Sequence, residues 1–153
     1  VLCTGNSCRS QIAEGYLRDF HNDVANIYSA GVETHGVNPR AIETMLADGI
    51  DISVHTSNHV DEYLDINFDL ILTVCDHASE RCPIFPSIAK RLHHNFPDPA
   101  KATGSEQEIQ EALEVSLIAC IIFIIFIIEY LKLHLIYTFW TPHFDKNCWN
   151  IKW

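Results

Sequence analysis

The sequence predicts one three-layer α/β/α domain built on a four-stranded parallel sheet. Along residues 1–114, short apolar segments typical of strands alternate with segments whose apolar residues recur at helical spacing. This alternation implies parallel strands joined by right-handed crossovers, with helices on both faces of the sheet. The 153 residues have the usual length of one domain, and 48% are hydrophobic, which is enough for a core. In such a fold, functional groups lie at the carboxyl ends of the strands.

Four strands are expected, at residues 1–2, 27–30, 68–74 and 92–96. The third is the clearest, since its apolar and β-branched residues should be buried on both faces of the sheet. The first keeps two residues where a typical strand has about five or six, so we expect a truncated central strand.

Helices are expected between and after these strands. The first has apolar residues at helical spacing over 12–20. A short helix after residue 57 should bury Val60, Tyr63 and Leu64. Residues typical of helix boundaries mark the other two helices: Asn38 and Pro39 at one start, Gly49 at its end, and Ser105 with Glu108 as a capping box at the last start.

A net charge of −10 excludes some partners. Nucleic acid and anionic membrane surfaces would repel the chain, so any anion must be held locally by a few donors. No charged segment followed by an apolar one opens the chain, so we expect no signal peptide. Four of the six cysteines form close pairs, Cys3 with Cys8 and Cys75 with Cys82, which indicates catalytic, redox or metal chemistry rather than a disulfide scaffold. We expect a cytoplasmic monomer.

The chain changes character near residue 115, where we divide it into two parts. Residues 1–114 hold 25 of the 30 charged residues, whereas residues 115–153 hold all three tryptophans and the apolar run 117–128. This run has no polar face, and it is shorter than the ~18–20 residues that span a bilayer. An altered, out-of-frame C-terminus and a helix buried or covered by a partner are therefore favoured over a membrane anchor.

The loop from Cys3 to Ser10 is the most informative segment. It lies between a strand end and a helix start, where backbone N–H groups and the helix dipole favour an anion. Gly5 permits a tight bend, Asn6 tolerates a left-handed conformation, and Arg9 offers a bidentate fork to a tetrahedral oxyanion. The same environment should lower the pKa of the Cys3 thiol, and Ser10 is placed to donate a hydrogen bond to the thiolate. The predicted oxyanion-binding residues are Thr4, Gly5, Asn6, Ser7, Cys8, Arg9 and Ser10.

This loop predicts a nucleophile that attacks phosphate or a phosphate-like oxyanion, and the alternative is a buried cysteine in an ordinary turn. Cys75 ends the third predicted strand, so it should lie at the same sheet edge as Cys3. Thiol–disulfide exchange explains why Cys75 is paired with Cys82, although two structural thiols or a metal site with His77 are alternatives. Asp98, on a stiff loop between two prolines, suits protonation of a leaving oxygen, and a turn aspartate is the alternative.

Six motifs occur in order along the chain: C-T-G-N-S-C-R-S-Q-x-A-E-G from residue 3, S-A-G from 29, N-P-R-A from 38, H-T-S from 55, T-V-C-D from 73 and N-F-P-D-P-A from 95. With them the chain resembles the low-molecular-weight tyrosine phosphatase superfamily, and specifically its thioredoxin-coupled arsenate reductases, over about residues 1–114. The resemblance implies reduction of arsenate to arsenite by a cysteine relay. Cys3 would be the nucleophile, Cys75 and Cys82 the resolving thiols, Arg9 and Asp98 the oxyanion ligand and the acid, and thioredoxin the electron donor.

Two alternatives remain beside arsenate reduction. One is a phosphatase of the same superfamily that uses only Cys3, Arg9 and Asp98. The other is an inactive thiol-based module that binds oxyanions or metals. Ala100 stands where the phosphatases carry an aromatic residue, which favours a small inorganic oxyanion.

The resemblance implies no resident cofactor beyond a monovalent cation that some of these reductases use. Four residues match the positions of that site: Asn6, Glu14, Ser29 and Thr56. Asn58 stands where those members have an aspartate, so we expect a weak or absent cation site.

Overall fold

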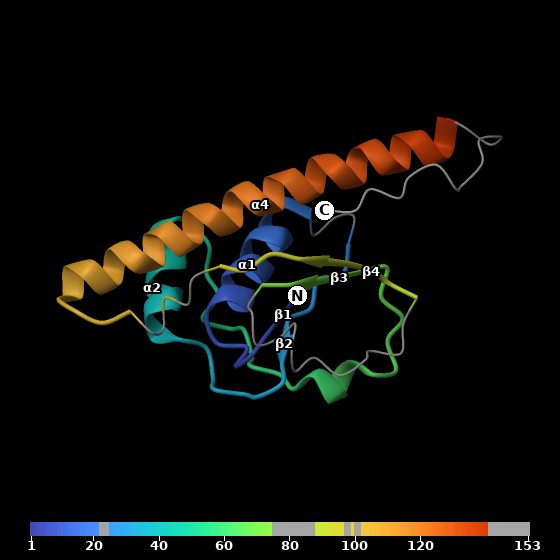
Figure 1. Cartoon of the computed structure of the whole chain (residues 1–153). Helices are drawn as coiled ribbons and strands as arrows, with labels where there is room; N and C mark the ends of the chain where they lie inside the picture. Colours follow the sequence, from blue (N-terminus) through green and yellow to red (C-terminus); the bar gives the residue numbers. More distant parts are fainter. Residues whose placement is uncertain (22–24, 75–87, 97–98, 100–101, 141–153) are drawn as a thin grey trace.

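The computed structural model describes residues 1–21, 25–74, 88–96, 99 and 102–140, and its centre is a four-stranded parallel sheet (Figure 1). The strands are β1 (Leu2–Cys3), β2 (Ala30–Gly31), β3 (Leu70–Thr73) and β4 (Lys90–His93), in the order β2-β1-β3-β4. All neighbouring strands pair in parallel. The predicted fold class is confirmed, and β1, although short, has neighbours on both sides.

The boundaries of all four strands differ from the prediction. β1 and β2 were expected at residues 1–2 and 27–30, and the structure has them at Leu2–Cys3 and Ala30–Gly31. β3 is shorter than expected, but Ile71 and Leu72 are buried on opposite faces of the sheet, as a central strand requires. β4 begins at Lys90, two residues before the predicted start, and ends at His93. It lies at the edge of the sheet, where polar side chains can face solvent, so its sequence lacks the apolar pattern on which the prediction depended.

The helices are α1 (Arg9–His21), α2 (Pro39–Ala47), the 3-10 helix η1 (Val60–Tyr63) and α4 (Glu106–Trp140). The predicted caps are confirmed: the Asn38 side chain accepts the Arg40 N–H at 2.9 Å, and Ser105 and Glu108 form the reciprocal capping box. Leu64, expected to be buried, is 43% exposed because η1 ends one residue before it.

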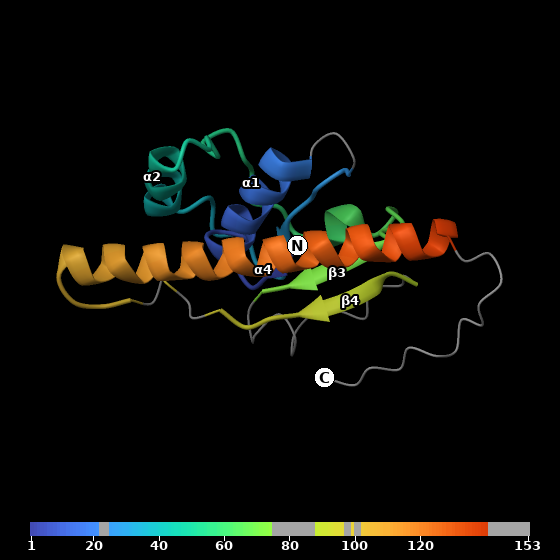
Figure 2. The ribbon, with the colours of Figure 1, turned by 90° about the horizontal axis from the view of Figure 1, so that it is seen from above.

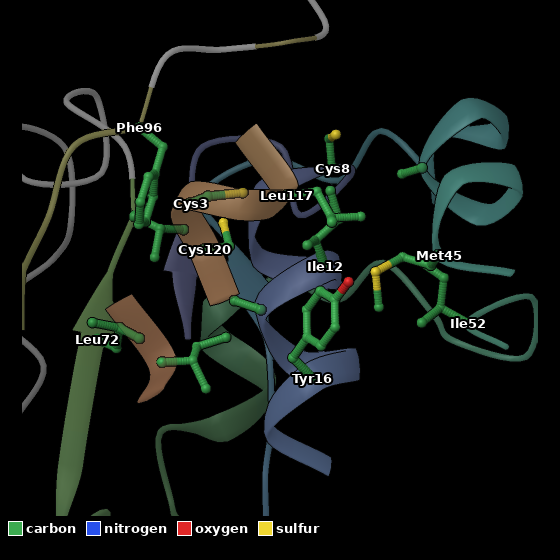
Figure 3. Packing of buried hydrophobic residues seen from close by; sticks show 14 of the residues in the cluster. Cys3, Cys8, Ile12, Tyr16, Met45, Ile52, Leu72, Phe96, Leu117 and Cys120 are labelled. Atoms are coloured by element: carbon green, nitrogen blue, oxygen red, sulfur yellow. The ribbon is translucent and has the colours of Figure 1, made fainter. Parts of the chain in front are cut away.

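Helices α1 and α4 pack together over one face of the sheet (Figures 1 and 2). The larger apolar cluster, which joins these helices to the sheet, contains Cys3, Ile12, Leu72 and Phe96 (Figure 3). A smaller cluster on the other face joins Leu2, Ala30, Ile71 and Val60 of η1. Neighbouring residues of one strand thus enter different clusters, as the alternation of side chains in a strand requires.

Helix α4 runs without a break through residue 115, where the sequence predicted a division of the chain. The division into two parts stays a prediction. The stretch Glu106–Ile127 of α4 is long and apolar enough to cross a membrane by length and composition alone. In this structure one side of that stretch packs on the domain core, including Leu117 and Ile124.

Candidate active site

Cys3 lies at the carboxyl end of β1, in the middle of the sheet, where its side chain is buried. Its Sγ atom is 3.0 Å from the Oγ atom of Ser10, in the first turn of α1. The Ser10 hydroxyl also accepts a hydrogen bond from the Asn6 side-chain amide at 2.9 Å. Because the Ser10 oxygen accepts that bond, the proton of the Ser10 hydroxyl is available for donation to Cys3. An O–H donor stabilises a thiolate more than a thiol. The predicted contact between Ser10 and Cys3 is confirmed.

Asn6 organises the loop from its centre. Its backbone is left-handed, with φ of 44°, as predicted, and its side chain is fully buried. The amide nitrogen donates to Ser10 and, at 2.7 Å, to the Oγ atom of Ser29, the residue just before β2. The amide oxygen accepts the backbone N–H of Asn58 at 2.7 Å. These bonds satisfy both ends of the buried amide and fix the orientation of the Ser10 hydroxyl.

The segment after β2 holds the loop from outside. The backbone N–H groups of Glu33, His35 and Asn38 donate to the carbonyls of Thr4, Gly5 and Ser7 at 2.9, 3.0 and 2.9 Å. A trans peptide holds its C=O and N–H on opposite sides, so the N–H groups of these three peptide units point away from that segment. The loop therefore turns amide donors toward its inner side, as an oxyanion cradle requires.

Gly31 makes this close approach possible. A Cβ atom there would lie 2.5 Å from the Glu33 carbonyl oxygen, 2.6 Å from that of Thr4 and 2.8 Å from the Asn6 backbone nitrogen. All three are backbone atoms, which cannot turn aside as a flexible side chain can. The glycine that ends β2 is therefore required by contact with the loop.

Arg9, the first residue of α1, connects the loop to the chain after β4. Its guanidinium is buried and donates to the Phe96 carbonyl at 2.9 Å. Phe96 in turn packs edge-on against Phe123 of α4, with ring centroids 5.7 Å apart. The predicted oxyanion ligand therefore holds the residue two positions before Asp98.

The buried Gln11 and the half-buried His55 extend this network; both stand in the quoted motifs, but neither was predicted as a site residue. The Gln11 amide donates to the Asn6 side-chain oxygen at 3.1 Å and to the Thr56 carbonyl at 2.9 Å. Its oxygen is 3.0 Å from Nδ1 of His55. Burial lowers the pKa of His55, against the opposing effect of Glu14, so the neutral ring is favoured. The available signal was a polar residue, Gln11, directly before the first apolar residue of a predicted helix.

Three thiols belong to the apolar cluster around the loop: Cys3, Cys8 and Cys120 (Figure 3). Cys8, predicted to support the loop, is buried. Burial raises the pKa of Cys120 to about 12, an effect that the Cys8 thiol increases and the Arg9 guanidinium reduces. Cys120 is therefore a protonated packing residue on α4 at neutral pH.

The remaining predicted residues divide into two groups. Cys75, Cys82 and Asp98 lie outside the described residues. Of the four cation-site candidates, Asn6 and Ser29 are brought together, but by a donor–acceptor hydrogen bond. The Glu14 carboxylate pairs with Arg18 at 2.6 Å, and the Thr56 hydroxyl donates to Asn58 at 2.6 Å.

Comparison with known proteins gives a consistent result. Residues 1–117 match the family described as low molecular weight phosphotyrosine protein phosphatase. The chain is 51% identical over 107 residues to an arsenate reductase of Halalkalibacterium halodurans, covering 70% of this chain and 77% of that protein. It is 47% identical over 117 residues to an arsenate reductase of Staphylococcus aureus strain Newman, covering 76% and 89%.

Solved structures agree with these sequence matches. An arsenate reductase in the phosphate-binding state superposes with a TM-score of 0.62 at 26% identity, over 80% of this chain and 92% of that chain. The tyrosine phosphatase Wzb from Escherichia coli K30, in complex with sulphate, gives the same TM-score, identity and coverage. Both structures hold a tetrahedral oxyanion.

Proposed function

The chain belongs to the low molecular weight phosphotyrosine protein phosphatase family and has the activity of its curated relatives, the reduction of arsenate; we propose that it does so by a cysteine relay coupled to thioredoxin. The observation that carries this proposal is the contact between the Cys3 sulfur and the Ser10 hydroxyl, in a loop whose carbonyls are held by the segment after β2. A stabilised thiolate beside Arg9 is suited to attack an oxyanion.

In the first step, the Cys3 thiolate attacks arsenate held by the loop amides and Arg9. A Cys3–arsenic bond forms, and one oxygen leaves as water after Asp98 donates a proton. The Cys75 thiolate then attacks the Cys3 sulfur. The electron pair of the sulfur–arsenic bond passes to arsenic, which leaves as arsenite, and a Cys3–Cys75 disulfide remains.

In the second half, Cys82 attacks Cys75 and releases Cys3 as a thiolate. The resulting Cys75–Cys82 disulfide takes two electrons and two protons from the dithiol of thioredoxin. This exchange needs a reducing compartment, so we place the protein in the cytoplasm. The closeness of Cys75 and Cys82 along the sequence supports this route over one that uses no second thiol.

The test is arsenate reduction with thioredoxin and its reductase in excess. Cys82→Ser should complete at most one turnover, because the Cys3–Cys75 disulfide cannot be resolved. Cys120→Ala removes a buried thiol that the relay does not use and should keep multiple turnover. Sustained turnover by Cys82→Ser with the same reductant would refute the relay.

A weak phosphatase activity is the second candidate function, and the sulphate-bound phosphatase among the structural neighbours favours it. Hydrolysis of an aryl phosphate needs Cys3, Arg9 and Asp98 but no second thiol. Cys3→Ser should therefore abolish both activities, whereas Cys75→Ser should abolish only the reduction. Loss of hydrolysis in folded Cys75→Ser would assign that residue a role outside the relay.

We also propose that the reaction needs no added monovalent cation. Arg18 already neutralises the buried Glu14 carboxylate, and Asn6 presents its amide nitrogen to Ser29. Replacing potassium with tetramethylammonium at constant ionic strength should leave the rate unchanged. A rate that rises with potassium in a saturable manner would contradict this proposal.

A further inference from the structure

Helix α4 carries two apolar rows with different surroundings. The inner row packs on the core of the domain, with side chains 1–8% exposed, and consists of Leu113, Leu117, Cys120, Ile124 and Ile127. The outer row lies on another side of the helix, with side chains 48–63% exposed, and consists of Val115, Ile118, Ile122 and Ile125. Phe126, 65% exposed, flanks the outer row.

The spacing of the outer row is that of a helix–helix contact. Its members are separated by alternating steps of three and four residues, the spacing that keeps a row of side chains facing a partner helix. The inner row alternates steps of four and three in the same way and does pack on a neighbour, since α1 lies against it (Figure 2). One turn after Ile125, the same spacing reaches Glu129, an exposed charged residue where the outer row ends.

Charge restricts what can cover this row. The chain has no charged side chain from residue 115 to 128, although its net charge is −10. Nucleic acid and anionic lipid are disfavoured by that net charge, and the row offers no cation to offset the repulsion. If α4 crossed a bilayer, lipid would surround it on all sides, which would pull the inner row out of the core. A neutral partner helix with the same spacing is not repelled by the net charge and leaves the inner row in the core. A second copy of this chain presents such a helix.

The exposed area is sufficient for a small specific interface. The four members of the outer row and Phe126 are each about half to two-thirds exposed, which leaves on the order of 100 Å² of each side chain in water. Two copies would therefore bury roughly 1,000 Å² through these residues, which is about the lower limit for a specific protein–protein contact.

We propose that two copies of this chain pair through the outer row of α4 across a two-fold axis, in place of the monomer expected from the sequence. The contact is isologous, so Ile122, in the middle of the outer row, lies near the middle of the same row in the partner. The pair is independent of the arsenate chemistry, because the inner row and the loop stay within each copy. Because the interface lies near the lower limit of size, we expect a weak, reversible pair whose dissociation depends on protein concentration.

The experiment is sedimentation velocity on the full chain between about 1 and about 100 μM. The mass should rise from 17.4 kDa to twice that value, and added salt should strengthen the pair by screening two acidic chains. Ile122→Glu should remain monomeric throughout. Val54→Glu adds the same charge at a side chain that is 81% exposed outside α4 and should pair as the wild type does.

A mixture of variants separates a direct contact from a fold defect. Equal amounts of Ile122→Glu and Ile122→Lys, each monomeric alone, should recover the dimer mass when combined, because opposite charges then meet in the middle of the interface. Circular dichroism of each variant should match the wild type, since Ile122 is 63% exposed in one copy. A wild-type mass of one chain at every concentration, dimers of Ile122→Glu alone, or flotation of the wild type with phosphatidylcholine vesicles would overturn the proposal.

Discussion

The hydrogen bond between Ser10 and Cys3 leads to a prediction that separates chemistry from packing. Ser10→Ala removes the only described hydroxyl within hydrogen-bond distance of the Cys3 sulfur, at 3.0 Å. Ser29→Ala is the matched control, because Ser29 accepts from the same Asn6 amide, at 2.7 Å, as the residue just before β2. Both variants remove one acceptor of Asn6, and only Ser10→Ala removes a hydroxyl beside the Cys3 sulfur.

The magnitude follows from the charge on the acceptor. A hydrogen bond to a charged group is worth about 1.5–3 kcal/mol, and about 1.4 kcal/mol corresponds to one pH unit. The acid limb of the pH profile of kcat/KM for Ser10→Ala should therefore move about one to two units toward higher pH. At a pH on that limb, the rate should fall about 10- to 100-fold, whereas above it the rates should converge.

The assay is kcat/KM against pH for arsenate reduction and for aryl phosphate hydrolysis, with thermal melting as a check on the fold. The shift should appear with both substrates, since Cys3 is the proposed nucleophile of both reactions. Ser29→Ala should keep the wild-type profile. If the Ser10→Ala profile coincides with that of the wild type, or if Ser29→Ala shifts equally, the hydroxyl does not stabilise the thiolate.

Three further predictions concern stability. Gly31→Ala should destabilise the fold by several kcal/mol or prevent folding. Gly36→Ala is the control: φ is +74° there, but a Cβ atom would meet nothing within 4 Å, so this variant should cost only about 1 kcal/mol. Equal melting temperatures of the two variants would contradict the close approach of β2 to the loop. Burial lowers the pKa of His55 from its ordinary value of 6.5, so below that pH the unfolded chain binds a proton at His55 more readily than the folded chain does. Acid should therefore lower the melting temperature of the wild type more than that of His55→Gln. Parallel pH curves would show that His55 contributes nothing to this loss. Phe123→Ala should cost about 2–3 kcal/mol, less than a fully buried Phe because Phe123 is only partly buried. It should also reduce kcat/KM, because the Phe123 ring packs on Phe96, whose carbonyl Arg9 binds. Unchanged catalysis in the folded variant would disconnect α4 from the site.

The sequence determined the architecture and much of the catalytic loop by itself. Alternation of strand and helix patterns predicted the parallel sheet, and Asn38 and Ser105 marked helix starts that the structure confirms. These features are local, since a cap or a left-handed residue such as Asn6 depends on a few neighbours in the chain. The contact of Ser10 with Cys3 was predictable for the same reason, because both residues lie within one loop and its helix.

Other features depend on residues that are distant in the chain, and only the tertiary structure decided them. Gln11 becomes a centre of the loop because Thr56 and His55 lie beside it, and no periodicity in the sequence indicates that meeting. The sequence showed that residues 117–128 are apolar on every side, but not which side would be buried. Packing against α1 and the sheet buried the inner row of α4 and left Ile122 and its neighbours exposed. Burial is settled by which surfaces meet, and a helix that is apolar all round carries no pattern from which that choice could be predicted.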